Sequence, residues 1–514
     1  VELFKNNAVA NSVSYDGESD STTTLESLLS QLDSVYLPEG VYIVGDLVLE
    51  GKHLYGEGTI LKSANAQNAI VMGSNSSVTG LKFRSTTTGN QRSEIKLGDG
   101  AFNVSIKDCD FDGTLYSAIS ADANGSSDEE LNYESPVSKV NISSNSFNGY
   151  SRPVYLHSVT ALTIQNNMFS NCYRDAIRLR QRVGECSIIG NVFFNIGESN
   201  PSILERPANW LSNGKNYEVD DYASVPPFGI YQCTVAHTST TLLNPATGGV
   251  GNWNLIDGSY FETKDAIDTY WSGKKLNISN NIVFGTASVG FDIKGSEPTG
   301  DYSTASVVIT NNVIMNTFGI GINMHSSDLL LSGQHRYVGR SVISNNVIHG
   351  CNSERYDVAQ SGINIRQGAS NMIITGNQIN NHFGRGLSVL NSDPQSKINK
   401  SMIITGNQIV DCGIPGHAGN IGLNVSPTDG LIIKDNVIEN TNFIPEYNLN
   451  LTGTPNGSNF TLVNAVDRAS VTIDTSDAVT SADVLTLIAT EMSNKEFPED
   501  PNPLFDIKYY GDIE

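Results

Sequence analysis

The 514-residue sequence has few basic residues and no long apolar runs, and each shortage argues against one class of protein. Lys and Arg number 31 against 54 Asp and Glu, which gives a net charge of -23. Nucleic-acid binding depends on Lys and Arg that displace counterions from phosphates, so we expect no nucleic-acid partner. No apolar run approaches the roughly 20 residues that cross a bilayer, and residues 1–11 lack the features of a signal peptide. We therefore expect no membrane insertion.

Cysteine is also scarce. The six cysteines stand singly, and Cys172, Cys351 and Cys412 each lie five residues after an Asn of the repeat described next. A recurring position of this kind predicts small buried side chains stacked in a column. We therefore expect no disulfide framework, no metal site and no cofactor.

What the sequence has in abundance is a repeat, in which an alternating apolar segment is followed by Asn, any residue and a large apolar residue. It occurs as LTIQNNMF, VVITNNVI and MIITGNQI, among others. The Asn residues of the repeat are Asn145, Asn167, Asn191, Asn281, Asn312, Asn346, Asn377, Asn407 and Asn436. Most intervals are 22 to 34 residues, which fits one turn of a solenoid made of three short strands. The repeat predicts an all-β chain folded as a right-handed parallel β-helix of about 12 to 13 coils.

The repeated Asn is predicted to be structural. We expect it at a tight bend, where Asn tolerates left-handed backbone geometry and its amide bonds to the next coil. Cys109 of VSIKDCDF takes the same position in an earlier coil. The 90-residue interval between Asn191 and Asn281 is expected to contain a further turn, with Ser259 in the Asn position.

The chain divides into three expected regions. Residues 1–40 form an N-terminal cap and lead-in segment, with a helix from about Thr24 to Leu32 that covers the first coil. Residues 41–454 form the β-helix, with an insertion loop at about 198–227 that we expect to be a groove wall and in which Glu205 is a reserve catalytic acid. Residues 455–514 form a small C-terminal module with one strand, FTLVNAV, and one helix, SADVLTLIATEM.

A second strand usually starts nine residues after the Asn, and its alternation predicts two rows of outward side chains. The first row reads Ser120, Tyr155, Arg178, Tyr231, Asp268, Asp292, Asn323, Asn364, Ser388 and Asn424. The second row reads Asp122, His157, Arg180, Cys233, Tyr270, Lys294, His325, Arg366, Leu390 and Ser426. Chemistry-bearing residues gather in the middle of both rows, so we expect the site there, facing solvent.

Asp268 and Asp292 are the first candidates for catalysis. They fall on neighbouring coils about 5 Å apart, close to the carboxylate separation of retaining glycosidases. Two carboxylates this close raise one pKa, which leaves one proton donor and one ionised partner. Asp265 is a third candidate, at a longer separation that suits an inverting mechanism. The alternative is that Asp268 and Asp292 only pair with Lys294 or Arg178.

The same region offers groups that bind sugars. Aromatic rings suited to stacking on a sugar belong to Tyr155, Tyr231, Tyr270 and Trp271. Groups suited to hydroxyls or acidic substituents belong to His157, Arg178, Arg180, Lys294, His325 and Arg366.

The opening TTTLESLLSQLDSVYLPEGVYIV, followed by Asn-containing coils, resembles bacteriophage tailspikes and, more broadly, the pectate-lyase-like β-helix families. The resemblance spans roughly residues 22–440. The resemblance implies a homotrimer on the virion tail that acts on a capsular or lipopolysaccharide glycan. It also implies attachment to the virion through an N-terminal domain missing from this sequence. A secreted protein is the alternative. Asp265-x-x-Asp268 is similar to the paired Asp of some endoglycosidase tailspikes, without their upstream Glu.

Three functions therefore stand open. The leading one is an endo-glycosidase that hydrolyses a bacterial surface polysaccharide. The second is a polysaccharide lyase, in which Arg178, Arg180 or Lys294 neutralises a uronate and a Tyr or His removes a proton. The third is a non-catalytic adhesin, because a fold does not fix an activity.

Overall fold

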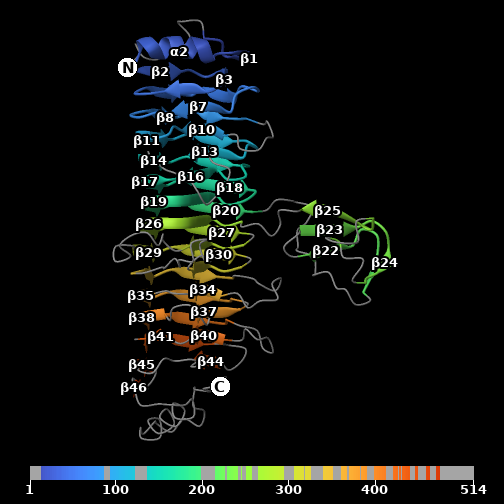
Figure 1. Ribbon diagram of the computed structural model, residues 1–514, viewed down its shortest axis with the longest axis vertical. Helices are drawn as coiled ribbons and strands as arrows, with labels where there is room; N and C mark the ends of the chain where they lie inside the picture. The colour runs from blue at the N-terminus through green and yellow to red at the C-terminus, as the bar shows by residue number, and fades with distance from the viewer. Residues whose placement is uncertain are drawn as a thin grey trace, which may run out of the picture.

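In the computed structural model the chain winds around a single axis as a solenoid (Figure 1). Its short strands form three stacks that run side by side along this axis, and in each stack the strands of successive coils lie one above another. The structure describes residues 13–85, 93–121, 136–197, 215–225, 229–240, 245, 251–257, 264–286, 288–294, 306–317, 319–325, 340–350, 361–366, 370–382, 384–390, 399–412, 421–425, 428–429, 431–439, 446–449, 459–463 and 470–474. No helix among these residues is long and apolar enough to cross a membrane.

The first sheet has 14 strands, all paired in parallel. In order they are β1 (Asp16–Asp20), β3 (Val41–Val44), β6 (Thr59–Lys62), β9 (Lys82–Phe83), β12 (Asp110–Asp112), β15 (Ser146–Asn148), β18 (Met168–Cys172), β20 (Val192–Ile196), β27 (Ile282–Thr286), β30 (Val313–Thr317), β33 (Val347–His349), β36 (Gln378–Asn380), β39 (Gln408–Val410) and β43 (Val437–Glu439). Each coil of the solenoid contributes one strand to this sheet.

The second sheet contains the strands that come just before the repeated Asn in each coil. Its strands are β2 (Ser34–Leu37), β5 (His53–Gly56), β8 (Ser77–Thr79), β11 (Phe102–Lys107), β14 (Val137–Ser143), β17 (Val159–Gln165), β29 (Ser306–Thr310), β32 (Val342–Ser344), β35 (Ser370–Thr375), β38 (Asn399–Thr405), β41 (Thr428–Asp429), β42 (Leu431–Lys434) and β45 (Asn459–Val463). One antiparallel strand, β46 (Ser470–Asp474), pairs with β45.

The third sheet carries the two outward rows. Its strands are β4 (Leu47–Leu49), β7 (Asn68–Met72), β10 (Ser93–Leu97), β13 (Ser117–Ala121), β16 (Val154–His157), β28 (Phe291–Lys294), β31 (Ile322–His325), β34 (Ser361–Arg366), β37 (Arg385–Leu390), β40 (Ile421–Val425) and β44 (Glu446–Leu449). Two 13-residue strands, β19 (Ile177–Ile189) and β26 (Ile267–Ser279), run through both the second and the third sheet. The predicted right-handed parallel β-helix is confirmed.

The repeated Asn forms a buried ladder along the solenoid. The backbone N–H and the side-chain Nδ2 of Asn167 both donate to Asn191 Oδ1, at 3.0 Å each, and Asn191 donates to Asn281 in the same way. The predicted left-handed geometry falls one residue earlier, because Asn166 (φ 54°) and Asn280 (φ 57°) adopt it while the ladder Asn does not. The ladder Asn is therefore selected for its hydrogen bonds and its neighbour for the turn.

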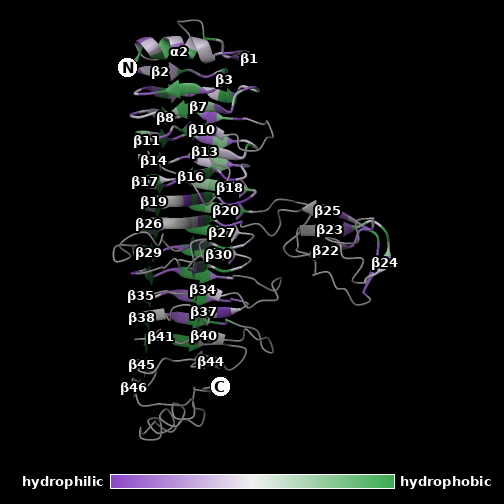
Figure 2. Ribbon diagram, viewed as in Figure 1, coloured by the Kyte–Doolittle hydropathy of each residue, from purple (hydrophilic) through white to green (hydrophobic). Residues whose placement is uncertain are grey.

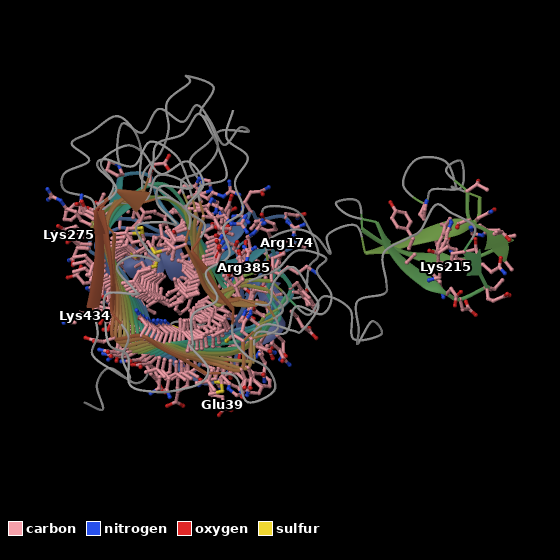
Figure 3. All side chains as sticks on the ribbon, turned by 90° about the horizontal axis from the view of Figure 1, so that it is seen from below. Glu39, Arg174, Lys215, Lys275, Arg385 and Lys434 are labelled. Carbon is pink, nitrogen blue, oxygen red and sulfur yellow. The ribbon has the colours of Figure 1, made fainter. Side chains whose placement is uncertain are left out.

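Large apolar residues of the repeat fill the interior next to the ladder. Phe111, Phe147, Phe169 and Phe193 stack with ring centroids 4.8 to 5.0 Å apart, which matches the spacing between coils. Figure 2 shows hydrophobic residues concentrated along the strands, and Figure 3 shows side chains filling the centre of the solenoid. Four buried free thiols lie among these core side chains, those of Cys109, Cys172, Cys186 and Cys412. Cys233 is also a buried free thiol but lies in a separate core, and Cys351 lies outside the described residues.

Helix α2 (Thr22–Gln31) covers the N-terminal end of the solenoid and buries Leu25, Leu28 and Leu29, which confirms the predicted cap. At the other end, β45 pairs in parallel with β42, so the solenoid pairing continues past residue 455, where we expected a separate module. The helix expected in SADVLTLIATEM lies outside the described residues.

The 90-residue interval contains a separate small unit and not a further turn. Its described strands form two small antiparallel sheets. In one, β21 (Asn216–Tyr217) pairs with β24 (His237–Thr238), and in the other β23 (Gly229–Cys233) pairs with both β22 (Tyr222–Val225) and β25 (Trp253–Asp257). The unit projects from the side of the solenoid (Figure 1). Because Asn191 bonds directly to Asn281, no coil with Ser259 in the ladder fits between them. The insertion is thus longer than the expected residues 198–227.

Candidate functional site

The register of the third sheet confirms most of the first row. Arg178 pairs with Tyr155 on one side and with Asp268 on the other, and Asp268 pairs with Asp292. The row continues through Asn323, Asn364, Ser388 and Asn424. Acidic side chains from adjacent coils are therefore neighbours, as the sequence predicts.

Tyr231 and Cys233 do not belong to these rows. They lie in β23 of the small projecting unit, where Tyr231 is 8% exposed and packs in a separate core with Tyr217 and Trp253. The prediction that Tyr231 faces a sugar on the solenoid is wrong. The segment GIYQC has the same small-apolar-polar alternation as a solenoid strand, and that similarity caused the error.

The prediction that the row faces solvent is also wrong. Asp268 is 0% exposed and Asp292 5%, although both side chains alternate with core residues such as Ile267 and Ile293. A buried carboxylate has to be paired or to hold a proton, because an isolated buried charge is very costly. The partners of each carboxylate therefore decide its state.

Lys294 joins the two catalytic candidates. Its Nζ lies 2.6 Å from Asp268 Oδ1 and 2.7 Å from Asp292 Oδ2. Asp292 also accepts a hydrogen bond from Asn323 Nδ2 at 2.8 Å, and His325 Nε2 lies 3.2 Å from it. Lys294 and His325 are thus partners of the acids, and the contacts with Lys294 are those that the alternative interpretation of Asp268 and Asp292 named.

On the N-terminal side, the site contains a residue that our sequence analysis missed. Asp175 is fully buried and accepts hydrogen bonds from Arg152 Nε at 3.1 Å and Arg178 Nη1 at 2.6 Å. Its other oxygen accepts the backbone N–H of Asp265 at 3.2 Å. Asp175 stands three residues before Arg178, as Asp265 stands three before Asp268, and this shared spacing was the signal that could have identified it.

Asp175, Asp265 and Asp268 form a compact group that we call the carboxylate cluster. One carboxylate oxygen from each lies within 4.8 Å of the other two, and all three residues are buried. Asp268 Oδ2 lies 3.4 Å from Arg178 Nε, so both Asp175 and Asp268 contact cations. Asp265 contacts none among the described residues, since its Oδ1 accepts the N–H of Val289 and its Oδ2 has no hydrogen-bond partner.

These contacts separate the protonation states of the acids. Burial, together with the negative charges of Asp292, Asp175 and Asp268, holds the pKa of Asp265 well above its usual range. Burial also raises the pKa of Asp268, although Lys294 and Arg178 oppose this effect. Burial disfavours ionisation of Asp292 as well, but Lys294 and His325 outweigh it and its pKa is lowered. Asp265 is therefore the acid that retains a proton.

The carboxylate cluster has the size of a divalent-cation site, since oxygen ligands are what Mg²⁺ and Ca²⁺ take. Arg152, Arg178 and Lys294 already neutralise Asp175 and Asp268, however, and they would repel a metal ion. The donor set thus suits a shared proton better than a metal. That the protein needs no metal remains a prediction.

The aromatic part of the site lies on the coils before the cluster. The rings of Tyr155 and His157 meet edge to face at 4.8 Å, and Tyr116 contacts Tyr155 in the same manner at 5.8 Å. Arg180 follows His157 in the second row, and Arg366 follows His325. Tyr270 pairs with Arg180 in β26, but its side chain and that of Trp271 lie outside the described residues, as does Glu205.

Comparison with known proteins gives a match to the solenoid itself. Residues 328–466 match the family described as "Right handed beta helix region". This match agrees with the fold. No curated protein matches the chain.

Several solved structures are similar at low identity. The tailspike of E. coli bacteriophage HK620, solved with a pentasaccharide, is 12% identical over 85% of this chain and 78% of that one, with a TM-score of 0.47. The A-module of the Azotobacter vinelandii mannuronan C-5 epimerase is 15% identical over 84% and 95%, with a TM-score of 0.44. The Dettilon tailspike is 14% identical over 84% of this chain and 66% of its own length, just under two thirds, with a TM-score of 0.42.

Proposed function

We propose that this chain is an endo-acting glycoside hydrolase of a phage tailspike, which cleaves a capsular or lipopolysaccharide chain of its bacterial host. The observation that carries the proposal is the contrast between Asp265 and Asp268. They lie within one cluster, yet Asp265 has no cation partner among the described residues and its pKa is held well above its usual range, whereas Asp268 is paired with Lys294 and Arg178. Retaining glycoside cleavage uses one carboxylic acid and one carboxylate at such close range.

In this proposal Asp265 is the general acid. It donates its proton to the glycosidic oxygen as the bond to the leaving sugar breaks. Asp268 attacks the anomeric carbon, and water then releases the glycosyl group with Asp265 acting as base. Lys294 and Arg178 oppose the effect of burial on the pKa of Asp268, whereas Asp265 has no cation partner among the described residues and stays neutral.

A glycan reaches these acids only if the outer side chains move. The carboxylates are fully buried, whereas Lys294 and His325 are 12% and 24% exposed at the outer edge of the site. Both belong to the second row, so a sugar that bound along that row would meet them first.

The test is depolymerisation of purified bacterial surface polysaccharides by the full chain, with mass analysis of the fragments. We expect fragments that have gained water, and their loss in Asp265→Asn and Asp268→Asn. Asp108→Asn is the matched control, because Asp108 is exposed and sits at φ 54°, a conformation that Asn tolerates. Full activity in both cluster variants would reject the assignment.

The same experiment separates the other two functions. A lyase would release fragments with an unsaturated uronate, which absorbs ultraviolet light. An adhesin would bind polymer without any fragment over long incubation. The structure offers less support to the lyase, because Arg178 and Lys294 are already paired with aspartates.

We also propose that three copies associate on a virion through the first sheet. An exposed apolar row runs across β18, β20 and β27 and consists of Met168, Val192 and Ile282. Beside it, the rings of Phe194 and Phe284 stack with centroids 5.7 Å apart. These two side chains are 41% and 42% exposed. A continuous apolar surface of this kind favours association. Native mass spectrometry should give a trimer, and Phe194→Lys with Phe284→Lys should yield monomer; a monomeric parent protein would reject the proposal.

A further inference from the structure

Two arginines lie beyond Asp292 on the C-terminal side of the site. Arg366 ends β34, two coils after Lys294 in the second row, and Arg385 begins β37 on the adjoining coil. Both side chains are half-buried. Figure 3 labels Arg385 on the side of the solenoid from which the small unit projects.

These two side chains differ from Arg152 and Arg178 in having no acidic partner among the described residues. Arg152 and Arg178 both contact Asp175. Within the described residues, by contrast, no carboxylate forms an ion pair with Arg366 or Arg385. The Nε atom of each is buried without a hydrogen-bond partner. Buried donors are normally satisfied, so an unsatisfied Nε on each of two arginines from adjoining coils requires an explanation.

The electrostatics of the pair point the same way. Burial lowers the pKa of Arg366, against the charge of Asp292, and burial together with the charge of Arg366 lowers the pKa of Arg385. A guanidinium nevertheless stays protonated in proteins. Two like charges thus remain partly desolvated near each other, which is unfavourable until an anion joins them.

The charge of the whole chain explains why such a local site matters. With a net charge of -23 the protein repels a polyanion, although salt screens this repulsion over about 8 Å. An acidic polymer therefore needs a short-range cationic contact to bind. Guanidinium groups match a carboxylate in planar geometry and form charge-assisted hydrogen bonds with it.

We propose that Arg366 and Arg385 bind the carboxylate of an acidic sugar, so that the substrate is an acidic polysaccharide. The inference rests on the proposed glycan-cleaving function and specifies its substrate class. Arg366 lies three coils from Asp268, about 14 Å at the usual strand spacing, so the acidic sugar lies a few residues along the polymer from the sugar at the carboxylate cluster.

The test uses the polysaccharides that the protein binds, each compared with its own carboxyl-reduced form, in which the acids have become alcohols. Binding is measured by affinity electrophoresis with the Asp265→Asn chain, so that no polymer is cleaved. We expect carboxyl reduction, Arg366→Gln and Arg385→Gln each to weaken binding on the order of 10-fold or more. Lys275→Gln removes an equal charge from an exposed residue that Figure 3 places on the opposite side, and should change nothing.

Arg366→Lys and Arg385→Lys are conservative variants that separate loss of binding from misfolding. Each keeps the positive charge and loses the planar guanidinium group, so each should bind the acidic polymer with intermediate affinity. Equal binding of native and carboxyl-reduced polymer, or binding unaffected by both Gln variants in chains with unchanged circular dichroism, would overturn the inference. If a neutral polymer is cleaved, the hydrolase stands and the inference fails. If acidic polymers bind through these arginines and are never hydrolysed, the inference stands and the hydrolase fails.

Discussion

The carboxylates of Asp265 and Asp268 lie within 4.8 Å of each other, but only Asp268 contacts a cation among the described residues. They stand three positions apart in sequence, with two residues between them, at the point where the chain enters β26. Their side chains share one buried environment and differ in their neighbours. Proximity of like charges together with unequal pairing is what allows two aspartates to hold different protonation states.

The first prediction concerns activity against pH. Since Asp265 has to be protonated to act as the acid, activity should be lost as pH rises through its raised pKa. Replacing Asp265 by Asn should lower kcat/KM about 10²- to 10⁴-fold and remove this alkaline limb. The pH profile of kcat/KM on a cleaved polysaccharide measures both effects. An Asp265→Asn variant that retains the alkaline limb would show that another group donates the proton.

The second prediction is that Asp265→Asn stabilises the protein at high pH. The folded state binds the Asp265 proton more tightly than the unfolded state, so stability falls as pH rises from about 3.8 to the raised pKa and stays lower above it. Each pH unit in that window is worth about 1.4 kcal/mol. An Asn is neutral throughout and escapes this loss.

Thermal unfolding midpoints at pH 5 and pH 8 should therefore diverge between the two proteins, with the variant melting higher at pH 8. Asp108→Asn, the exposed control, should follow the parent protein at both values. A variant that melts lower than the parent at pH 8 would mean that Asp265 is ionised and stabilising.

Much of this arrangement could be predicted from the sequence. The Asn repeat fixes the coil and its register, which placed Arg178, Asp268 and Asp292 in one row. The pairing partners could not be predicted in full, because Asp175 lies outside the strand pattern that was used to align the coils. Tyr231 was misplaced because periodicity cannot show that an insertion folds by itself.

The third prediction concerns Lys294. Without its ammonium group, Asp268 and Asp292 lose their shared partner, so Lys294→Met should cost about 3–5 kcal/mol near neutral pH. The lowered pKa of Asp292 stabilises the fold above about pH 3.8 and this contribution is lost as pH falls through the folded value. The difference between variant and parent should thus narrow in acid.

Denaturant midpoints at pH 7 and pH 3 measure the Lys294 effect. Lys275→Met is the control, because Lys275 pairs with Glu185 on the surface and 68% of its side chain is exposed. This substitution should change the free energy of unfolding by less than about 1 kcal/mol. An equal loss at both pH values would attribute the effect of Lys294 to packing.

The fourth prediction is stereochemical. Inverting enzymes need about 6.5–9.5 Å between their carboxyl groups to admit a water molecule, and the carboxylate cluster lies within 4.8 Å. The reaction should therefore retain the anomeric configuration. Proton NMR of the first-formed reducing end, recorded before mutarotation, decides this. An inverted first product would place the catalytic base outside the carboxylate cluster.

The last prediction concerns the Asn ladder that sets the register on which the site depends. Asn281 is fully buried, donates to Ile188 O and Asn312 Oδ1, and accepts two bonds from Asn191. Asn281→Ala leaves these partners unsatisfied in the interior and should cost about 3 kcal/mol or more. Asn280→Gly is the adjacent control, because Gly adopts the φ of 57° that Asn280 has and Asn280 itself is exposed.

Asn436 provides a graded comparison, since it ends the observed ladder, is only half-buried and accepts from Asn407 alone. Replacing Asn436 by Ala should lower the free energy of unfolding by less than replacing Asn281 does. Asn436 has a ladder bond to one neighbouring coil and Asn281 to two, and water can reach the gap that the half-buried Asn436 would leave. Urea midpoints of the three variants should rank Asn281→Ala lowest and Asn280→Gly highest. Equal midpoints for Asn281→Ala and Asn280→Gly would show that turn geometry, and not the ladder, holds successive coils in register.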